Sequence, residues 1–249
     1  MNASHEWIPS QREAIPHKNE VHVWRISVPK FREIIPQLQP VLNEEERTRA
    51  DRFHFDKDQE SYIIAHSVLR LLLGGYAQLP SEEIEFTVNN YGKPQIVDNS
   101  LQFNLSHSGD FVLIAIANSL ILGVDVEKIH TRRAKIVLAK RFFSPLEFDH
   151  LMQLASGDFV QGFFNTWTRK EAYIKAIGAG LSIPLDSFTV SLKTDSPVEL
   201  IEDSVNTNAP GEWTLKHIKV NDDYAAALAV KCKEVELKLF DWLGPINLD

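Results

Sequence analysis

The chain has 249 residues, 44% of them hydrophobic and 24% charged, which is the balance of a globular protein with one large domain or two small ones. The formal net charge of -8 argues against non-specific nucleic-acid binding, which needs a basic surface. One cysteine, Cys232, excludes an internal disulfide and a cysteine metal cluster. Because residues 1–20 lack the apolar core of a signal peptide and the sequence has no run of about 18 apolar residues, we expect a cytoplasmic protein without a membrane span.

The first part of the sequence combines strand and helix patterns behind an N-terminal extension, residues 1–20, which we expect to be loose. Asn43 is a suitable N-cap, the three glutamates after it suit the positive end of a helix dipole, and Gly74-Gly75 is a stop signal. The predicted elements are a strand over 21–26, a mostly helical segment over 44–75, a strand over 84–88 and a turn-rich loop over 89–94.

The middle of the chain predicts strands separated by short loops. Segments 101–103 and 111–117 are strand-like and flank a predicted loop over 104–110, which contains a Ser-His-Ser sequence. A short turn then leads into a predicted strand over 120–127, so these segments suggest a hairpin.

The last part of the chain also mixes helix and strand patterns. Ser144-Pro145-Leu146-Glu147 predicts a helix start with a capping box and with proline at the first helical position. A long predicted helix over 158–177 ends at Gly178-Ala179-Gly180, and strands follow over 187–192, 212–220 and 224–230. The fold class that these patterns predict is α/β (α+β).

A weak internal repeat suggests how the elements are organised. A strand, a helix near an Arg-Phe pair, an apolar helix that ends at glycine and a strand with Phe-Thr-Val occur in residues 20–100 and again in 120–195. The match is short enough to arise by chance, but it favours two pseudo-twofold-related α/β halves packed face to face with a site between them. We expect an N-terminal half over 21–119 and a C-terminal half over 120–249.

Candidate metal ligands stand in the C-terminal half. Asp125 and Glu127 are two residues apart in a predicted strand and share one face, which we expect to be exposed, whereas the neighbouring valines face the core. Glu171 and Lys175 are four residues apart in a predicted helix and lie on one side of it. Three carboxylates suit Mg²⁺, whose other ligands are commonly water and substrate phosphates. Taken singly, each feature is also explained by a solvated edge strand or by an exposed Glu–Lys pair.

The Ser106-His107-Ser108 sequence is a candidate anion site. No Gly-x-Ser-x-Gly elbow surrounds it, and adjacent serine and histidine side chains point in different directions on most backbones, which argues against a catalytic nucleophile. Hydroxyl, imidazole and loop amide groups all donate to phosphate oxygens. Lys93, in the predicted loop over 89–94, is a candidate for an ion pair with a second phosphate, or is simply solvated.

In combination these motifs resemble the Sfp-type 4'-phosphopantetheinyl transferases. The resemblance runs from about Val21 to about Val230 and so covers most of the chain. The segments that carry it are Gly92-Lys93-Pro94, Phe103-Asn104-Leu105-Ser106-His107-Ser108, Gly123-Val124-Asp125-Val126-Glu127, Arg141-Phe142-Phe143-Ser144, Trp167-Thr168-Arg169-Lys170-Glu171-Ala172-Tyr173-Ile174-Lys175-Ala176, Gly178-Ala179-Gly180-Leu181 and Pro184-Leu185-Asp186-Ser187-Phe188.

The resemblance implies transfer of the 4'-phosphopantetheine arm of coenzyme A to a serine of an apo acyl or peptidyl carrier protein, with release of 3',5'-ADP. It implies a monomer that binds coenzyme A between its halves and carries a metal site in the C-terminal half. The implied site residues are Asp125, Glu127 and Glu171 as ligands of Mg²⁺; Glu171 as acceptor of the serine proton, directly or through a metal-bound water; Lys175 at the pyrophosphate; and Ser106, His107, Lys93 and Arg49 at the 3'-phosphate, with Arg47 or Arg52 as alternatives to Arg49.

One basic segment of this acidic chain would suit such a partner. Carrier proteins are often acidic around the modified serine, so residues 128–141, rich in lysine and arginine, are a candidate docking surface, or else a solvated helix face. Two other functions stay open: a metal-dependent nucleotide pyrophosphohydrolase that uses the same acids to activate water, and a coenzyme A-binding regulator without turnover. Glu171 and Lys175 argue against the regulator, since a pure binder needs no proton acceptor.

Overall fold

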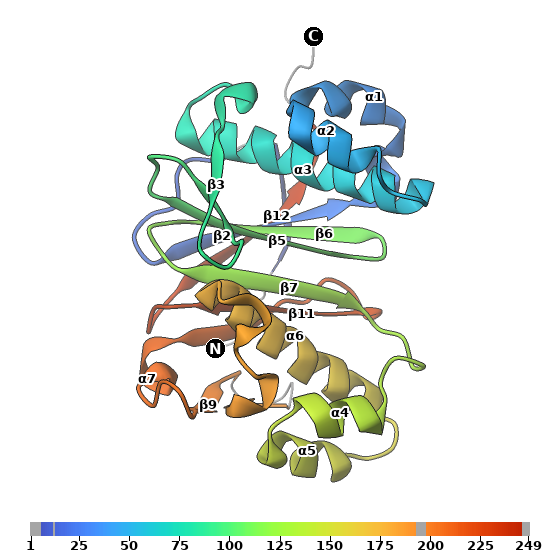
Figure 1. Ribbon diagram of the computed structural model, residues 1–249, viewed down its shortest axis with the longest axis vertical. Coiled ribbons are helices and arrows are strands. Elements are labelled where there is room, and N and C mark those ends of the chain that lie inside the picture. Colours follow the sequence, from blue (N-terminus) through green and yellow to red (C-terminus); the bar gives the residue numbers. More distant parts are fainter. Residues whose placement is uncertain (1–5, 12, 193–197, 246–249) are drawn as a thin grey trace.

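The computed structural model of the chain describes residues 6–11, 13–192 and 198–245 and confirms a mixed α/β fold. Two β-sheets lie face to face in the middle of the molecule, and helices cover the outer side of each sheet (Figure 1). Helices α1, α2 and α3 lie over one sheet, whereas α6 lies against the other sheet and α4 and α5 lie beyond α6. Elements of both halves therefore surround any site that forms where the sheets meet.

Helices and strands come in runs along the chain. The helices are α1 (Ile35–Leu38), α2 (Glu44–Ala50), α3 (Asp56–Ala77), α4 (Ile136–Phe142), α5 (Pro145–Met152), α6 (Phe159–Ile177) and α7 (Ala209–Glu212). The strands are β1 (Ile8–Ser10), β2 (Glu20–Ser27), β3 (Phe86–Val88), β4 (Pro94–Ile96), β5 (Leu101–Ser108), β6 (Phe111–Asn118), β7 (Leu122–Lys128), β8 (Phe188–Val190), β9 (Leu200–Asp203), β10 (Thr214–His217), β11 (Tyr224–Val230) and β12 (Glu236–Trp242). No helix within the described residues is long and apolar enough to cross a lipid bilayer.

The two large sheets differ in size and in the origin of their strands. The first has five strands in the order β1-β12-β2-β6-β5, and the second has three in the order β10-β11-β7. Neighbours β2, β6 and β5 are antiparallel, whereas β12 joins β2 in parallel. Because β12 comes from the end of the chain, a C-terminal strand completes the sheet that the first half mainly builds.

The central strands are buried on both faces, because successive side chains of a strand point to opposite sides. In β2, Val21 and Val23 join the core between the two sheets, whereas Trp24 and Ile26 pack in the core under α3. In β11, Leu228 faces the first sheet and its neighbours on the other face pack toward α6. Three apolar layers result, and the middle layer holds the two sheets together.

Helix α6 lies very close to β7 at Gly123. A Cβ atom on this glycine would lie 2.2 Å from the carbonyl oxygen of Ala172 and 2.4 Å from the amide nitrogen of Ala176. On β11, Ala227 and Ala229 offer only small side chains in the core that they share with α6. Small residues therefore let the helix that carries the predicted acid and lysine approach the strand that carries the other two acids.

Two predictions about the ends of elements were wrong. Part of the N-terminal extension, expected to be loose, forms β1, which pairs in parallel with β12. This pairing and β12 itself were not predicted, because the partner of each strand lies at the other end of the chain. The segment expected to be mostly helical over 44–75 is formed by α2, which ends at Ala50, and by α3, which starts at Asp56 and runs through the expected stop signal at Gly74-Gly75 to Ala77.

The predicted loop over 104–110 was wrong as well. β5 continues through Ser108 and pairs with β6 as far as a tight turn at Gly109, where φ is +59°. The suggested hairpin is therefore formed by β5 and β6, while β7 leaves their sheet and pairs with β11 in the second sheet. Polar residues at alternate positions of β5 gave the strand the composition of a loop.

Candidate active site at the junction of the two sheets

Two edge strands of different sheets, β5 and β7, are joined by side chains. In an ordinary β-ladder, backbone carbonyl oxygens accept the hydrogen bonds from the neighbouring strand; here, side chains at every second position of β5 accept them instead. We call this arrangement the side-chain ladder. It consists of three hydrogen bonds from backbone N–H groups of β7, namely Val124 to Asn104 Oδ1 (2.8 Å), Val126 to Ser106 Oγ (3.3 Å) and Lys128 to Ser108 Oγ (3.0 Å).

Asp125 lies in the middle of this junction and is only 3% exposed. Its Oδ1 atom accepts hydrogen bonds from Ser106 Oγ at 2.8 Å and from Lys175 Nζ at 2.5 Å. The neighbouring Val124 and Val126 face the core between the sheets, as predicted. The expectation that the acid face of the strand is exposed was wrong for Asp125, because α6 packs against that side of β7 and brings Lys175 onto the carboxylate.

Two further carboxylates lie close enough to interact with Asp125. Glu127 Oε2 accepts a hydrogen bond from Ser108 Oγ at 2.9 Å, and Glu171 stands on α6 one turn before Lys175. Burial raises the pKa of Glu127, and the charge of Asp125 raises it further. Burial and then the charge of Asp125 raise the pKa of Glu171 to about 6. The three acids therefore repel one another, and Lys175 offsets part of their charge.

Asp125, Glu127 and Glu171, which we call the acid cluster, have the donor chemistry of a divalent-cation site. Asp125 Oδ2 is buried and has no hydrogen-bond partner among the described residues, which is a costly state for an acceptor. Within residues 6–11, 13–192 and 198–245, no three His, Cys, Asp or Glu side chains are close enough to hold a metal ion as they stand. Hard oxygen donors and a buried, unpaired carboxylate oxygen nevertheless fit Mg²⁺ or Mn²⁺, provided that the side chains close around the ion.

Lys93 lies next to the end of α6 rather than in open solvent. Its Nζ atom donates to the carbonyl oxygens of Leu122 at 3.0 Å and Ala176 at 2.9 Å, and burial lowers its pKa to about 8. The neighbouring Asn89 donates to the carbonyl oxygen of Gly178 at 2.9 Å. The loop before β4 is thereby tied to β7 and α6, and two of the three donors of the Lys93 ammonium are already in use.

Of the three arginines considered at the start of the chain, Arg49 lies beside aromatic residues of α3. Its guanidinium lies 5.6 Å from the centroid of the Tyr62 ring, which stacks on His66. Burial, with the charges of Arg49 and His107, lowers the pKa of His66 to about 4, so these groups are near neighbours. Arg47 instead donates to the carbonyl oxygen of Leu42.

Two cavities open on either side of the acid cluster. One, of about 280 Å³, is lined by Glu171 and Lys175 together with the Gly92-Lys93-Pro94 loop and Asn104. The other, of about 260 Å³, is lined by Glu127 with an apolar floor and a basic rim, formed by Leu138, Phe163, Phe164, Trp167, Arg132, Arg133 and Lys135. A molecule whose reacting bond lies at the acid cluster therefore has space on both sides of that bond.

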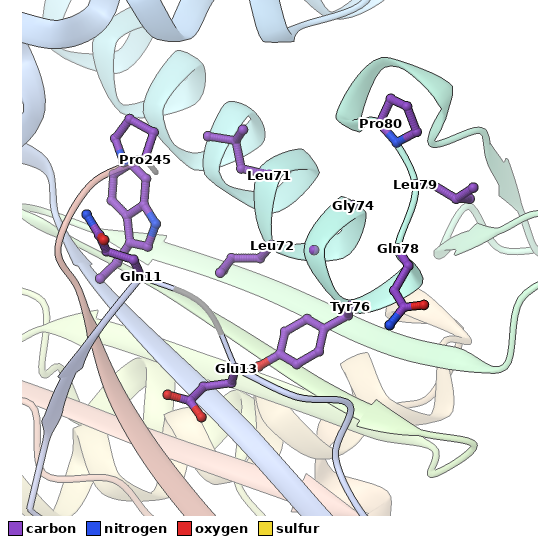
Figure 2. Close-up of a pocket in the computed structure, with 12 residues that line it drawn as sticks. Gln11, Glu13, Leu71, Leu72, Gly74, Tyr76, Gln78, Leu79, Pro80 and Pro245 are labelled. Atoms are coloured by element: carbon purple, nitrogen blue, oxygen red, sulfur yellow. The ribbon is translucent and has the colours of Figure 1, made fainter. Parts of the chain in front are cut away.

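A third cavity, of about 460 Å³, lies at the other end of the first sheet (Figure 2). It is formed by the last turn of α3, the Gln78–Pro80 segment and the side chains of Glu13 and Trp242. No residue of the acid cluster lines it. The chemistry indicated by the sequence therefore belongs to the junction of β5, β7 and α6.

Comparison with known proteins identifies the family of this chain. The family model of the 4'-phosphopantetheinyl transferase superfamily matches residues 121–229, and that of 4'-phosphopantetheinyl transferase, N-terminal, matches residues 23–119. The chain belongs to the 4'-phosphopantetheinyl transferase superfamily. The family resemblance read from the sequence is thereby confirmed.

Two relatives of known family support the same membership. The chain is 32% identical to 4'-phosphopantetheinyl transferase HetI of Nostoc sp. over 230 residues, which cover 91% of this chain and 94% of the relative. It is 36% identical to 4'-phosphopantetheinyl transferase Sfp of Bacillus subtilis over 160 residues, 64% of this chain and 70% of the relative. Among solved structures, the Thermotoga maritima holo-[acyl-carrier-protein] synthase is similar with 19% identity and a TM-score of 0.37 over 46% of this chain and 65% of that one.

The structure brings together Asp125, Lys175 and Ser106, with Glu127 and Glu171 beside them. Sequence reasoning assigned no role to Asn104 and considered Ser108 only as part of a candidate anion site, although both belong to the side-chain ladder. The sequence did contain a pattern, since polar residues occur at every second position from Asn104 to Ser108. This pattern indicates a polar strand face only if the segment is a strand, and it was read as a loop.

Proposed function

We propose that this chain transfers the 4'-phosphopantetheine arm of coenzyme A to a serine of an apo acyl or peptidyl carrier protein and releases 3',5'-ADP. The observation that carries the proposal is the acid cluster with Lys175 between two cavities, in a chain that belongs to this superfamily. One cavity has room for the leaving nucleotide, and the other for the pantetheine arm and the attacking serine.

Asp125, Glu127 and Glu171 are the side chains that would hold a divalent cation, which we expect to be Mg²⁺. The ion, when bound, neutralises negative charge on the pyrophosphate during the transfer. Three acids with one lysine leave the site with surplus negative charge, and the buried Oδ2 atom of Asp125 lacks a partner. Both properties support a cation at this position.

The protein groups have separate tasks in the transfer. Lys175 would contact the pyrophosphate and stabilise the charge that develops on the leaving 3',5'-ADP. Glu171 would accept the proton of the attacking serine hydroxyl at its carboxylate, and a pKa raised to about 6 by burial suits a base that works near neutral pH.

The 3'-phosphate of coenzyme A would bind at the end of β5, at Ser106, His107 and Arg49. Ser106 would then donate its hydroxyl proton to the phosphate in place of the hydrogen bond to Asp125 that it makes in this structure. Partial burial and then the charge of Lys175 lower the pKa of His107, which favours the neutral imidazole, so Lys175 and Arg49 would supply the positive charge here. Lys93 would add one remaining donor, because two carbonyl oxygens already hold its ammonium.

The carrier protein would dock on α4 and the basic segment before it. Lys140 and Arg141 lie in the last turn of α4, and Val137 is 75% exposed on the same helix. An apolar side chain among cations suits an acidic partner with an apolar helix face. We further propose a cytoplasmic monomer without nucleic-acid partners, built of an N-terminal extension (1–20) and two halves (21–119 and 120–249), with β12 returned to the first sheet.

The test is intact-protein mass spectrometry of an apo carrier protein incubated with this chain, coenzyme A and Mg²⁺. We expect the mass of the carrier protein to rise by one phosphopantetheine arm, and the gain to vanish with EDTA. Glu171→Gln is the matched control, because it keeps the shape of the side chain but removes the proton acceptor.

The two rival functions give different results in the same experiment. A pyrophosphohydrolase would release 3',5'-ADP from coenzyme A without any carrier protein. A coenzyme A-binding regulator would leave both coenzyme A and the carrier protein unchanged over a panel of acyl and peptidyl carrier proteins. Either result would overturn the proposed transfer.

A further inference from the structure

The two serines of the side-chain ladder repeat one arrangement. Ser106 Oγ accepts from the N–H of Val126 and donates to Asp125 Oδ1 at 2.8 Å. Ser108 Oγ accepts from the N–H of Lys128 and donates to Glu127 Oε2 at 2.9 Å. A backbone N–H can only donate, so the single hydroxyl proton of each serine is left for the carboxylate. Each serine is therefore fixed by one residue of β7 and directs its proton at the acid just before it.

The third member of the ladder lacks a carboxylate partner. Asn104 accepts from the N–H of Val124 in the same way, but the residue before Val124 is Gly123, which has no side chain to hold. Two positions of the ladder thus hydrogen-bond a carboxylate, and the third only joins the two strands. This difference separates a role in positioning the acids from a role in holding the sheets together.

Glu127 depends more on its serine hydrogen bond than Asp125 does. Asp125 also forms an ion pair with Lys175, whereas the groups around Glu127 shift its pKa in opposite directions. Burial and the charge of Asp125 raise its pKa, while the Ser108 hydrogen bond and the charge of Arg133 lower it. Arg133 lines the neighbouring cavity, so without Ser108 the carboxylate would be repelled by Asp125 and drawn toward that cation.

We infer that Ser108 is a positioning residue that holds the carboxylate of Glu127 beside Asp125, in the place where a divalent cation is bound. The inference rests on the proposed metal site and adds to it a residue that touches neither the cation nor coenzyme A. Groups that orient metal ligands through hydrogen bonds typically change metal affinity by about 10- to 100-fold when they are removed. Ser106 serves Asp125 in the same manner, with Lys175 as a second support.

The test measures the binding of Mn²⁺ to the full chain in the absence of coenzyme A. The electron paramagnetic resonance signal of the free ion gives the amount of Mn²⁺ that is not bound. We expect Ser108→Ala to weaken Mn²⁺ binding by about 10-fold. Ser108→Thr keeps a hydroxyl on a strand and should bind Mn²⁺ nearly as the unchanged chain does. Asn104→Ala is the matched control, because it removes a ladder hydrogen bond but no carboxylate contact, and its Mn²⁺ affinity should stay within about twofold of the unchanged chain.

The outcomes separate the inference from the proposed metal site. If the unchanged chain binds no Mn²⁺, the metal site itself is wrong and the inference falls with it. If the unchanged chain binds Mn²⁺ and Ser108→Ala binds it equally well, the metal site stands and the positioning role is wrong. Equal losses in Ser108→Ala and Asn104→Ala would show that the ladder acts only through the fold, which also overturns the inference. Should Ser108→Ala fail to fold, Ser108→Cys, nearly equal in size with a weaker donor, must show the loss instead.

Discussion

Asp125 is held by two groups that also belong to the proposed reaction site. Its Oδ1 atom accepts from Ser106 and Lys175, and the side chain is almost completely buried. A carboxylate in this position is not a solvated surface acid, and its removal changes the charge of the site as well as its ligands. Asparagine in its place would keep the shape and one oxygen acceptor but lose the negative charge.

We therefore expect Asp125→Asn to lower phosphopantetheine transfer by at least about 100-fold, because a charged group at the reacting centre is lost. The fold should remain, since the Lys175 side chain is 30% exposed and can reach water or the other acids. Transfer rates at saturating Mg²⁺ measure the first effect and circular dichroism the second. Asp110→Asn is the control, because Asp110 pairs with Lys57 and Lys128 outside the acid cluster; a similar loss there would contradict the assignment.

Glu171 gives the site a dependence on pH. Its pKa of about 6 lies above the ordinary 4.5, so the folded chain binds this proton more tightly than the unfolded chain does. Without a cation, that contribution to stability is complete below pH 4.5 and is lost as the pH rises through about 6. A divalent cation competes with the same proton, so its stabilising effect should follow the opposite course.

We expect Mg²⁺ at about 100 times its dissociation constant to raise the melting temperature by several degrees at pH 7.5, and much less at pH 5. Differential scanning fluorimetry at the two pH values measures the difference. In Glu171→Gln, the cation effect should be smaller and should lose most of its pH dependence. An equal shift of the melting temperature at pH 5 and pH 7.5 in the unchanged chain would contradict the role of Glu171.

The sequence predicts which residue types meet at the site better than it predicts their surroundings. Asp125 and Glu127 are two residues apart and share one face of a strand, and Glu171 and Lys175 are four residues apart and share one face of a helix. The structure brings these two faces together. The burial of Asp125 could not be predicted, because it depends on how closely α6 approaches β7. The role of Lys93 as a link to two carbonyl oxygens depends on tertiary contacts in the same way.

At the scale of elements, the approach of α6 to β7 decides whether Lys175 reaches Asp125. Gly123→Ala would place a methyl group 2.2 Å from the carbonyl oxygen of Ala172, and neither backbone segment can yield without moving the helix. We expect a loss of about 3 kcal/mol or more in unfolding free energy, measured in urea, and a lower transfer rate. Gly157→Ala is the control, since a Cβ there meets nothing within 4 Å. A stable, fully active Gly123→Ala chain would mean that this contact does not set the position of α6.

Elements with a local signal were predicted, and those that depend on distant partners were not. The N-cap at Asn43 and the capping box at Ser144 both form as expected, because a capping box is contained within four residues. The second part of β5, residues 104–108, was taken for a loop because its polar residues contact β7 rather than water. β1 and β12 pair with each other across the length of the chain, and no local pattern reveals that pairing.

At the scale of the whole molecule, the two sheets are tied together in two places. At the edge formed by β5 and β7, the side-chain ladder and Lys93 join β5 and its neighbouring loop to β7 and α6. Near β2 and β12, Arg25 forms a second tie. Its Nη1 atom donates to the carbonyl oxygen of Val220 at 2.6 Å, its Nε and Nη2 atoms hold Asp241 at 2.7 and 2.8 Å, and its guanidinium lies 4.2 Å from the centroid of the Trp7 ring.

This second tie gives the N-terminal extension a structural role. Trp7 donates from Nε1 to the carbonyl oxygen of Lys219 at 2.8 Å, so the segment before β1 contacts the chain between β10 and β11. Arg25 stands on β2 of the first sheet and reaches the same place in the second half. Since these contacts involve neither the acid cluster nor the cavities beside it, their loss should act on stability and leave the chemistry in place.

We expect Arg25→Ala to lower the unfolding free energy by about 2 kcal/mol, because a two-pronged ion pair, a charged hydrogen bond to a carbonyl and an aromatic contact are lost together. The turnover number for transfer should stay within about twofold. Urea unfolding and steady-state transfer rates measure the two effects. Arg32→Ala is the matched control, because Arg32 is 42% exposed where Arg25 is 17% exposed, and its pair with Glu60 should contribute less than about 1 kcal/mol. A large fall in turnover for Arg25→Ala with unchanged stability would mean that the tie controls the spacing of the two halves at the site instead of their cohesion.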